Sequence, residues 1–164
     1  MSSFSRREFA LLVALPMLGG CDFKPIYAKG TAARGLTGQI ALGQVSDRIG
    51  FEMHEELELR LGKAVLPKYV LDVQIEIESE GLAITADAAI TRFNLSATAT
   101  YKLTPVVGGD PVLVDHARSF TAYSATASAF ATRVAERDAR RRLAVAIADQ
   151  IATRIAATAA DLPA

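Results

Sequence analysis

The sequence predicts an α+β fold, a two-layer sandwich with two helices on one face of a mostly antiparallel sheet of about four strands, in the order βαβββα. Three runs of alternating apolar and polar residues occupy positions 69–123, and such alternation is typical of strands with one wet face. Stretches of helical periodicity flank them at residues 49–63 and 128–157. Short connections predict antiparallel neighbouring strands, whose apolar face the helices would cover. The 164 residues, 51% of them hydrophobic, suffice for one such domain.

The first strand and the first helix are predicted from residues 39–63. Residues 39–45 hold spaced apolar side chains before a turn and predict a short strand. Residues 49–63 alternate in part like a strand, but they are rich in helix-forming leucine, glutamate and arginine and almost lack β-branched residues. Met53, Leu57 and Leu61 also recur at the four-residue spacing of one helix face. We therefore expect a helix over this segment.

The middle of the chain contains the clearest strand pattern. Over residues 69–78, apolar side chains point one way and mostly acidic or amide side chains point the other. A turn is predicted near Glu80-Gly81, and a second alternating run follows at residues 92–103. Each strand therefore has one face suited to a core and one face suited to water.

A hairpin loop, a fourth strand and a long helix complete the predicted domain. The loop at residues 107–111 reads VGGDP, in which the glycines accept positive φ angles and the proline cannot donate to a strand ladder. Residues 112–123 predict the fourth strand. Neither glycine nor proline interrupts residues 128–157, and Ser128 has the side chain of an N-cap. The apolar stripe of this helix comprises Phe130, Val134, Ala139, Leu143, Ile147, Ile151 and Ile155.

The start of the chain predicts export and acylation. An arginine pair at residues 6–7 precedes an apolar run of about ten residues, which is typical of a signal peptide and too short to span a bilayer. The run ends in LGG followed by Cys21, which looks like a bacterial lipobox and implies cleavage before a lipidated cysteine. We assign residues 1–20 to a signal peptide, 21–37 to a lipidated N-terminus and tether, and 38–160 to one domain. The arginine pair fits both the general and the twin-arginine export routes.

Composition excludes several classes of site. One cysteine and two histidines rule out a disulfide within the chain and a Cys/His zinc site. A net charge of zero argues against nucleic acid as a partner, and no cofactor or metal is predicted. His54 and His116 lack a partner that the sequence can place beside them, so we expect no enzyme. A small periplasmic hydrolase that uses either histidine is the competing hypothesis.

The strongest local charge lies at the start of the last helix. A guanidinium binds phosphate or carboxylate groups bidentately, so this cluster is a candidate anion site. The alternative is a solvated helix face, partly neutralised by Glu136–Arg140 and Asp138–Arg142 pairs. The sequence leaves both interpretations open. The cluster comprises Arg133, Arg137, Arg140, Arg141 and Arg142.

Three stretches carry a family resemblance through their order along the chain. Residues 21–27 read CDFKPIY, residues 91–95 read TRFNL and lead to YKL at 101–103, and residues 118–123 read RSFTAY before the last helix. Together they resemble the LptE family of bacterial lipopolysaccharide-assembly lipoproteins, over essentially the whole mature chain. The resemblance implies an outer-membrane lipoprotein that faces the periplasm and is anchored by acyl chains such as palmitate.

The resemblance also implies partners and contact residues. A family member would dock in the β-barrel LptD, help it assemble, and assist lipopolysaccharide insertion into the outer leaflet without catalysis. Arg133 aligns best with a basic position that contacts lipid A phosphates, and Arg137 and Arg92 are further candidates. A second basic position of the family falls near residues 83–86, which hold no arginine or lysine. Asp22 resembles an inner-membrane retention signal of enteric bacteria.

One alternative to the barrel subunit stays open. A lipoprotein with the same anchor and fold could act alone and bind a lipid or glycan in a groove between the sheet and the helices, with no barrel partner.

Overall fold

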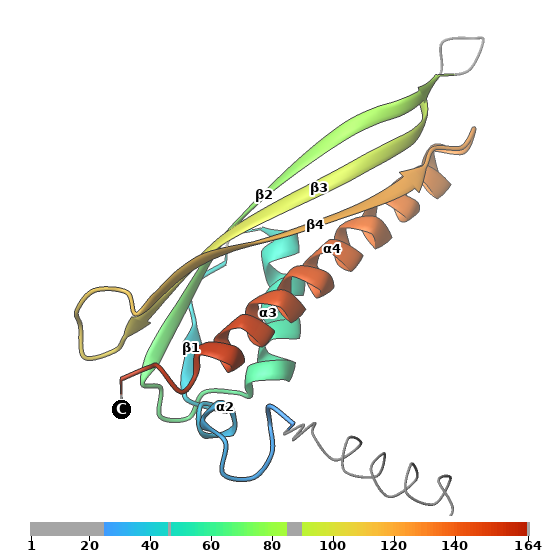
Figure 1. The fold of residues 1–164 in the computed structure, drawn as a ribbon. Helices are drawn as coiled ribbons and strands as arrows, with labels where there is room; N and C mark the ends of the chain where they lie inside the picture. Colours follow the sequence, from blue (N-terminus) through green and yellow to red (C-terminus); the bar gives the residue numbers. More distant parts are fainter. Residues whose placement is uncertain (1–24, 46, 85–89, 164) are drawn as a thin grey trace, which may run out of the picture.

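A four-stranded sheet with helices on one face forms the body of the molecule (Figure 1). The computed structural model describes residues 25–45, 47–84 and 90–163. The predicted α+β class and element order are confirmed, with one additional short helix. The elements in chain order are α2 (Ala32–Gly35), β1 (Ile40–Leu42), α3 (Arg48–Leu61), β2 (Tyr69–Ile84), β3 (Ile90–Pro105), β4 (Leu113–Ser124) and α4 (Ala129–Thr158).

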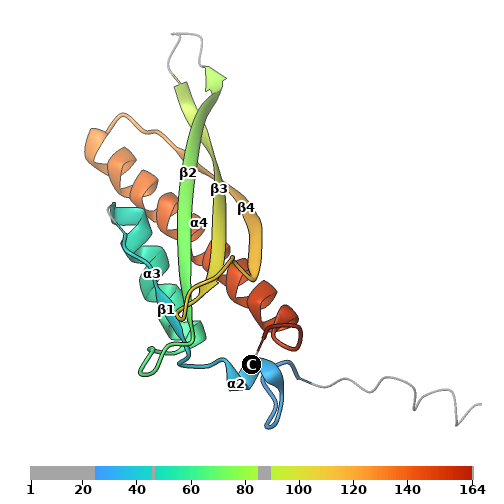
Figure 2. The ribbon, with the colours of Figure 1, turned by 90° about the vertical axis from the view of Figure 1, so that its left-hand side faces the viewer.

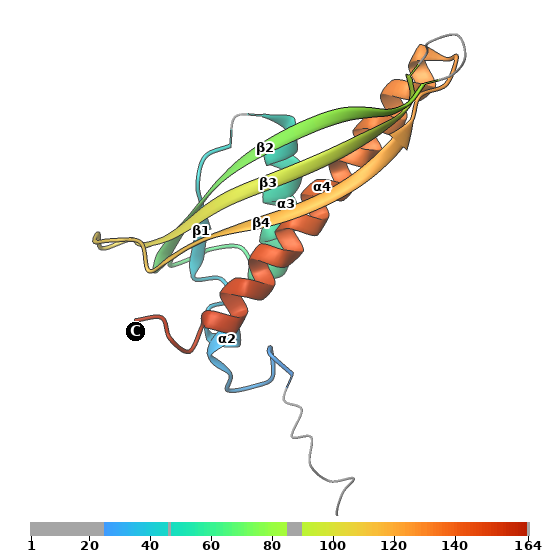
Figure 3. The same cartoon turned by 45° about the horizontal axis from the view of Figure 1, so that its top comes forward.

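The sheet is mixed and keeps chain order, β1-β2-β3-β4. The three long strands are antiparallel neighbours, as predicted, and only β1 runs parallel to its partner β2. A parallel pair needs a crossover connection, and α3 supplies it. Figure 3 shows β2, β3 and β4 running side by side above α4. The two longer helices, α3 and α4, lie on the same side of the sheet, and α2 packs against the end of α4.

The core forms between β3 and α4. Alternate residues of β3, from Leu95 to Leu103, are at most 2% exposed, as the period-two pattern predicts. The apolar stripe of α4 is buried from Ala139 to Ile155. Small residues beside the stripe are buried as well, namely Ala144, Ala148 and Ala152, and α4 contacts both α3 and β4. The apolar faces predicted from strand and helix periodicity thus pack against each other.

The predicted turn at Glu80-Gly81 is wrong, because β2 continues past it. Glu80 pairs with Asn94 and Gly81 with Phe93, and the register shifts between Gly81 and Ile84. A glycine inside a strand often marks a bulge rather than a turn. The alternation remains in phase with β3 up to this point, so continued pairing outweighs the local turn preference. The residues between β2 and β3 lie outside the described ranges.

The first two members of the predicted α4 stripe are not buried. Phe130 is 70% exposed and Val134 is 48% exposed. The cause is a difference in helix length, since α4 has 30 residues and α3 has 14, which correspond to about 45 Å and 21 Å. Figures 1 and 2 show that α3 accompanies only the part of α4 beyond its first turns. The start of α4 therefore projects past its helical neighbour.

The segment before β1 contains a short helix that the sequence pattern did not predict. α2 begins within the predicted tether, residues 21–37, after Thr31, whose side chain accepts a hydrogen bond from the Arg34 amide. Ala33 is buried in a small cluster with Ala156 and Ala159 of the C-terminal region. A four-residue helix is too short to leave a periodic signal. The helix α2 is therefore packed against the domain through Ala33.

Because Tyr101 is buried in the core, the free energy of unfolding depends on pH in the alkaline range. Burial, with a further contribution from Asp115, raises the pKa of Tyr101 to about 12 from 10.0. The unfolded chain releases this proton at a lower pH than the folded chain, so the free energy of unfolding decreases as the pH rises from 10 to 12. We expect Tyr101→Phe to lose less stability over that interval than the unmodified protein. Urea unfolding at several alkaline pH values measures the difference, and parallel losses would contradict it.

Candidate functional site

The end of the molecule that carries the start of α4 is tied together by local hydrogen bonds. We call it the distal end; it contains the last residues of β2, the first residues of β3, and residues 124–134. The Ala125 amide donates to the Thr91 carbonyl (2.9 Å), and Ser128 caps α4 by accepting from the Ala131 amide (3.3 Å). The Thr126 amide donates to the Thr132 hydroxyl (3.0 Å). These contacts set the position of the first turns of α4 relative to β3 and β4.

Two arginines of the cluster on α4 are engaged within the fold. Arg140 donates to Glu136 through Nε (3.0 Å) and Nη2 (2.9 Å), and Arg142 pairs with Asp138. Both pairs match those predicted from the four-residue spacing. Arg142 also donates to the Ala122 carbonyl of β4 (3.3 Å), so it joins the helix to the edge of the sheet. These two side chains are structural.

The other three arginines of the cluster form a row along α4. Arg133, Arg137 and Arg141 are exposed and follow one another at four-residue spacing. Within the described ranges none of them takes part in an ion pair. Like charges at this spacing destabilise a helix, and guanidinium groups bind phosphate or carboxylate bidentately. The row is thus chemically suited to an anion that carries several negative charges.

The structure brings two of the three predicted contact residues together and separates the third. Arg133 and Arg137 share one face of α4. Arg92 is exposed and lies opposite Ser124 near the distal end of the sheet. Its neighbour Phe93 points to the helix side, where it stacks on Tyr123 with ring centroids 5.2 Å apart. Because side chains alternate along a strand, Arg92 belongs to the sheet face that points away from α4.

That face of the sheet is polar, and no described residue covers it. It presents acidic side chains on β2, hydroxyl side chains on β3, and His116 and Arg118 on β4, as in the cross-strand row Glu76, Thr98 and Arg118. Phe120 lies on the same face and is 87% exposed. We call this surface the open face. Its members are Asp72, Gln74, Glu76, Glu78, Glu80, Arg92, Asn94, Ser96, Thr98, Thr100, Lys102, Val114, His116, Arg118 and Phe120.

One long edge of the sheet is free of strand partners. β1 pairs with β2 only from Tyr69 to Leu71, and the Gly43 amide adds one bond to the Leu71 carbonyl (2.8 Å). Beyond Leu71, β2 has no strand on this side in the part of the chain that the structure describes. Unpaired N–H and C=O groups at such an edge are a template for another strand. On the opposite edge, the Gln150 side-chain amide of α4 caps the Arg118 carbonyl (2.9 Å).

The two histidines lie on different elements and have different neighbours. His54 is half-buried on α3, with Nε2 4.0 Å from a Glu58 carboxylate oxygen. His116 is exposed on β4 beside Asp115. The His116 amide and Arg154 hold the pKa of Asp115 below its usual value, and the 2.9 Å bond from Arg154 Nε connects this carboxylate to α4. No group of three possible metal ligands occurs among the described residues.

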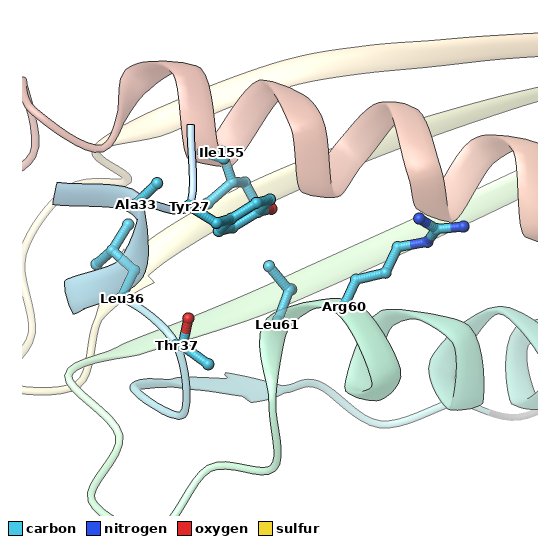
Figure 4. Close-up of a pocket in the computed structure, with 8 residues that line it drawn as sticks. Tyr27, Ala33, Leu36, Thr37, Arg60, Leu61 and Ile155 are labelled. Atoms are coloured by element: carbon cyan, nitrogen blue, oxygen red, sulfur yellow. The ribbon is translucent and has the colours of Figure 1, made fainter. Parts of the chain in front are cut away.

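Two of the cavities next to the helices are small, whereas an open hollow of about 490 Å³ between α3 and α4 is lined in part by Arg60, Arg141 and Asp149. One small cavity lies between α2, α3 and α4, where Tyr27 is placed near Ala33 and Ile155 (Figure 4). A second lies beside β1 and α3. Each has a volume of about 10 Å³, which is near the minimum for one water molecule. Neither accommodates an acyl chain or a sugar. No helix within the described ranges is long and apolar enough to cross a membrane.

The predicted signal peptide at residues 1–20 and the predicted lipidation site at Cys21 lie outside the described residues. The exposure of Phe130 and Val134 is the site feature that the sequence pattern missed. The sequence signals this exposure only through length: the helix predicted at residues 128–157 is about twice as long as the helix predicted at 49–63, which therefore cannot cover all of it.

Solved structures with the same fold come from several bacteria. A protein described as a lipoprotein from Caulobacter crescentus CB15 is 17% identical, with a TM-score of 0.66, and the match covers 79% of this chain and 97% of that one. Rare lipoprotein B from Shewanella oneidensis is 15% identical, with a TM-score of 0.58 and coverage of 75% and 96%. Lipoprotein B from Nitrosomonas europaea is 12% identical, with a TM-score of 0.59 and coverage of 85% and 94%.

Sequence comparison gives the family. No curated protein sequence matches the chain. The model of the LptE family, described as lipopolysaccharide-assembly, matches residues 37–155. This range includes every strand, α3 and nearly all of α4, and so covers well over half of the sequence. The chain therefore belongs to the LptE family of lipopolysaccharide-assembly proteins.

Proposed function

We propose that this protein is an acyl-anchored, non-catalytic subunit of the outer membrane that docks in an LptD-like β-barrel. In that position it helps the barrel to assemble and assists the insertion of lipopolysaccharide into the outer leaflet. The observation that carries the proposal is the open face, a polar sheet surface backed by a tightly packed core. The lumens of porin-type barrels are polar, so a subunit enclosed by one needs a hydrogen-bonding exterior.

The open face and the free edge of β2 supply complementary kinds of contact. Carboxylates on β2 and Arg118 on β4 would orient the subunit against charges of opposite sign on the barrel wall. Phe120 is the most exposed large apolar side chain of this polar surface, and such aromatic residues often dominate the binding energy. A strand or loop of the barrel could pair with β2 beyond Leu71, which would also remove an aggregation hazard.

The start of α4 would contact lipopolysaccharide. Arg133, Arg137 and Arg141 offer guanidinium groups to its phosphates. Phe130 and Val134 lie one helical turn from members of this row and offer apolar surface beside it. A row of cations next to exposed apolar side chains suits a ligand that is both anionic and acylated. Arg92 reaches the same end of the molecule from the open face.

Acylation of Cys21 would hold the subunit at the membrane. We expect mass spectrometry of the protein extracted from outer membranes to show a chain that begins at Cys21 and carries acyl chains. Two or three chains make attachment effectively permanent, since each buried methylene contributes about 0.8 kcal/mol. Cys21→Ser should release the protein from the membrane fraction. An unmodified Cys21 in protein from that fraction would contradict the anchor.

Docking through the open face is tested by Phe120→Asp. We expect this change to reduce co-purification with the barrel by about tenfold or more, because it places a charge at the apolar point of the interface. The matched control is Leu59→Asp, which alters a 76% exposed residue on α3. Circular dichroism verifies that both variants fold. Equal co-purification of the two variants would show that the open face is not the docking surface.

Binding of lipopolysaccharide through the arginine row is tested by a double variant. Arg133→Ala combined with Arg137→Ala should weaken binding of lipopolysaccharide about tenfold or more, since charge-assisted hydrogen bonds to phosphate are lost. Arg48→Ala combined with Arg154→Ala removes the same charge outside both the row and the rest of the proposed contact surfaces and should have little effect. Lipopolysaccharide without its lipid A phosphates should bind both double variants alike. A loss that persists with this ligand would rule out phosphate recognition by the row.

A further inference from the structure

The end of the molecule opposite the distal end has its own surface chemistry. We call it the base; it comprises residues 25–38, 62–68, 106–112 and 159–163, which Figure 2 shows around α2 and the C-terminus. Exposed apolar side chains gather there. Val107 is 97%, Val65 83% and Leu66 82% exposed. The other exposed apolar residues of the base are Ile26, Tyr27 and Val106.

Backbone hydrogen bonds hold the connections of the base in one arrangement. The Val65 amide donates to the Gly38 carbonyl (3.3 Å), and the Lys68 amide donates to the Gln39 carbonyl (2.8 Å). The Val106 amide donates to the Lys68 carbonyl (2.8 Å). Residues 62–68 are therefore fixed both to the start of β1 and to the end of β3. A surface hollow of about 450 Å³ lies between them, lined in part by Pro67, Lys68, Pro105, Val106 and Val107.

The N-terminal part of the base is packed against the domain. Figure 4 shows Tyr27 between α2 and Ile155 of α4, with Leu61 nearby. The Thr31 hydroxyl donates to the Ile26 carbonyl (2.8 Å) and to the Ala28 carbonyl (2.9 Å). The Ala28 amide donates to the Pro25 carbonyl (2.9 Å), so Pro25 is tied to the same turn.

The charges of the base are mainly positive. Its exposed basic residues are Lys29, Arg34, Lys63 and Lys68, and its exposed acidic residues are Asp110 and Asp161. The described part of the base therefore has four cations against two anions. Exposed apolar side chains among cations are typical of surfaces that bind the interface of an anionic bilayer. The surplus of positive charge disfavours contact between the bases of two copies.

The length of the N-terminal chain brings this surface to a membrane. Cys21 precedes Pro25 by four residues, which span at most about 14 Å when fully extended. If Cys21 is acylated, as the proposed function requires, Pro25 stays within that distance of the lipid that receives the acyl chains, and the rest of the base extends from this point. An apolar, cationic surface held so near to lipid headgroups would meet them continually.

We infer that the base is a membrane-docking surface for the leaflet that holds the acyl chains. The side chains of Val65, Leu66 and Val107 enter the headgroup region, and Lys63 and Lys68 contact lipid phosphates. Docking then orients the molecule, because the distal end with its arginine row points away from that leaflet. The lipid anchor limits only the distance from the membrane, whereas this surface would set the direction of the long axis.

Vesicle binding by the unacylated protein tests the inference. The mature chain from residue 21 with Cys21→Ser is mixed with vesicles of phosphatidylethanolamine and phosphatidylglycerol, and bound protein is measured by co-sedimentation. We expect measurable binding that Leu66→Asp combined with Val107→Asp weakens about tenfold or more. The matched control, Leu59→Asp combined with Phe120→Asp, alters equally exposed apolar residues outside the base and should bind like the parent.

The lysines provide a second readout. Lys63→Gln combined with Lys68→Gln should lower binding to vesicles with phosphatidylglycerol and should change little with phosphatidylcholine vesicles. No binding of the parent, or equal losses in the two aspartate variants, would overturn the inference. The inference would also be overturned if Leu66→Asp combined with Val107→Asp abolished co-purification with the barrel but left vesicle binding unchanged. The base would then be a contact surface for protein. An unmodified Cys21 contradicts the proposed anchor but leaves the vesicle result unaffected.

Discussion

The packing of β3 on α4 is the interaction on which the other features depend. Alternate residues of β3 are almost fully buried, including Leu95, Tyr101 and Leu103, and they meet a helix stripe that includes Leu143 and Ile147. Because strand side chains alternate, the same geometry turns the hydroxyl and amide residues of β3 outward. The polar open face is therefore a direct consequence of the core, and β2 and β4 extend it on both sides with charges of opposite sign.

The two ends of the molecule differ because its elements differ in length. α4 continues past α3 at the distal end, which leaves the start of the helix with exposed arginines and apolar side chains. At the base the helices and strands end together, and short connections with exposed apolar and basic residues cover them. Ion pairs of Arg140 and Arg142 stabilise the helix, and Arg142 also bonds to β4, so only part of the arginine cluster remains available for a ligand.

The similarity to solved lipoproteins at 12–17% identity shows how little of the sequence specifies this fold. A pattern of apolar and polar residues with the correct period is enough to define each element and its buried face. Function is not carried over in the same way, since it depends on particular side chains such as Phe120 and Arg133. Membership of the LptE family therefore does not by itself establish which side chains of this chain contact a partner or a ligand.

Local patterns sufficed for the type and order of the main elements, the buried faces of β2 and β3, the N-cap Ser128 and the ion pairs on α4, because each depends on residues a few positions apart. Only tertiary packing decided the extent of β2, the parallel pairing of β1, the helix α2 within the expected tether, and the exposure of Phe130 and Val134. It also placed Arg92 on the opposite side of the sheet from Arg133. These features depend on which elements end beside one another, and periodicity within a single element contains no such information.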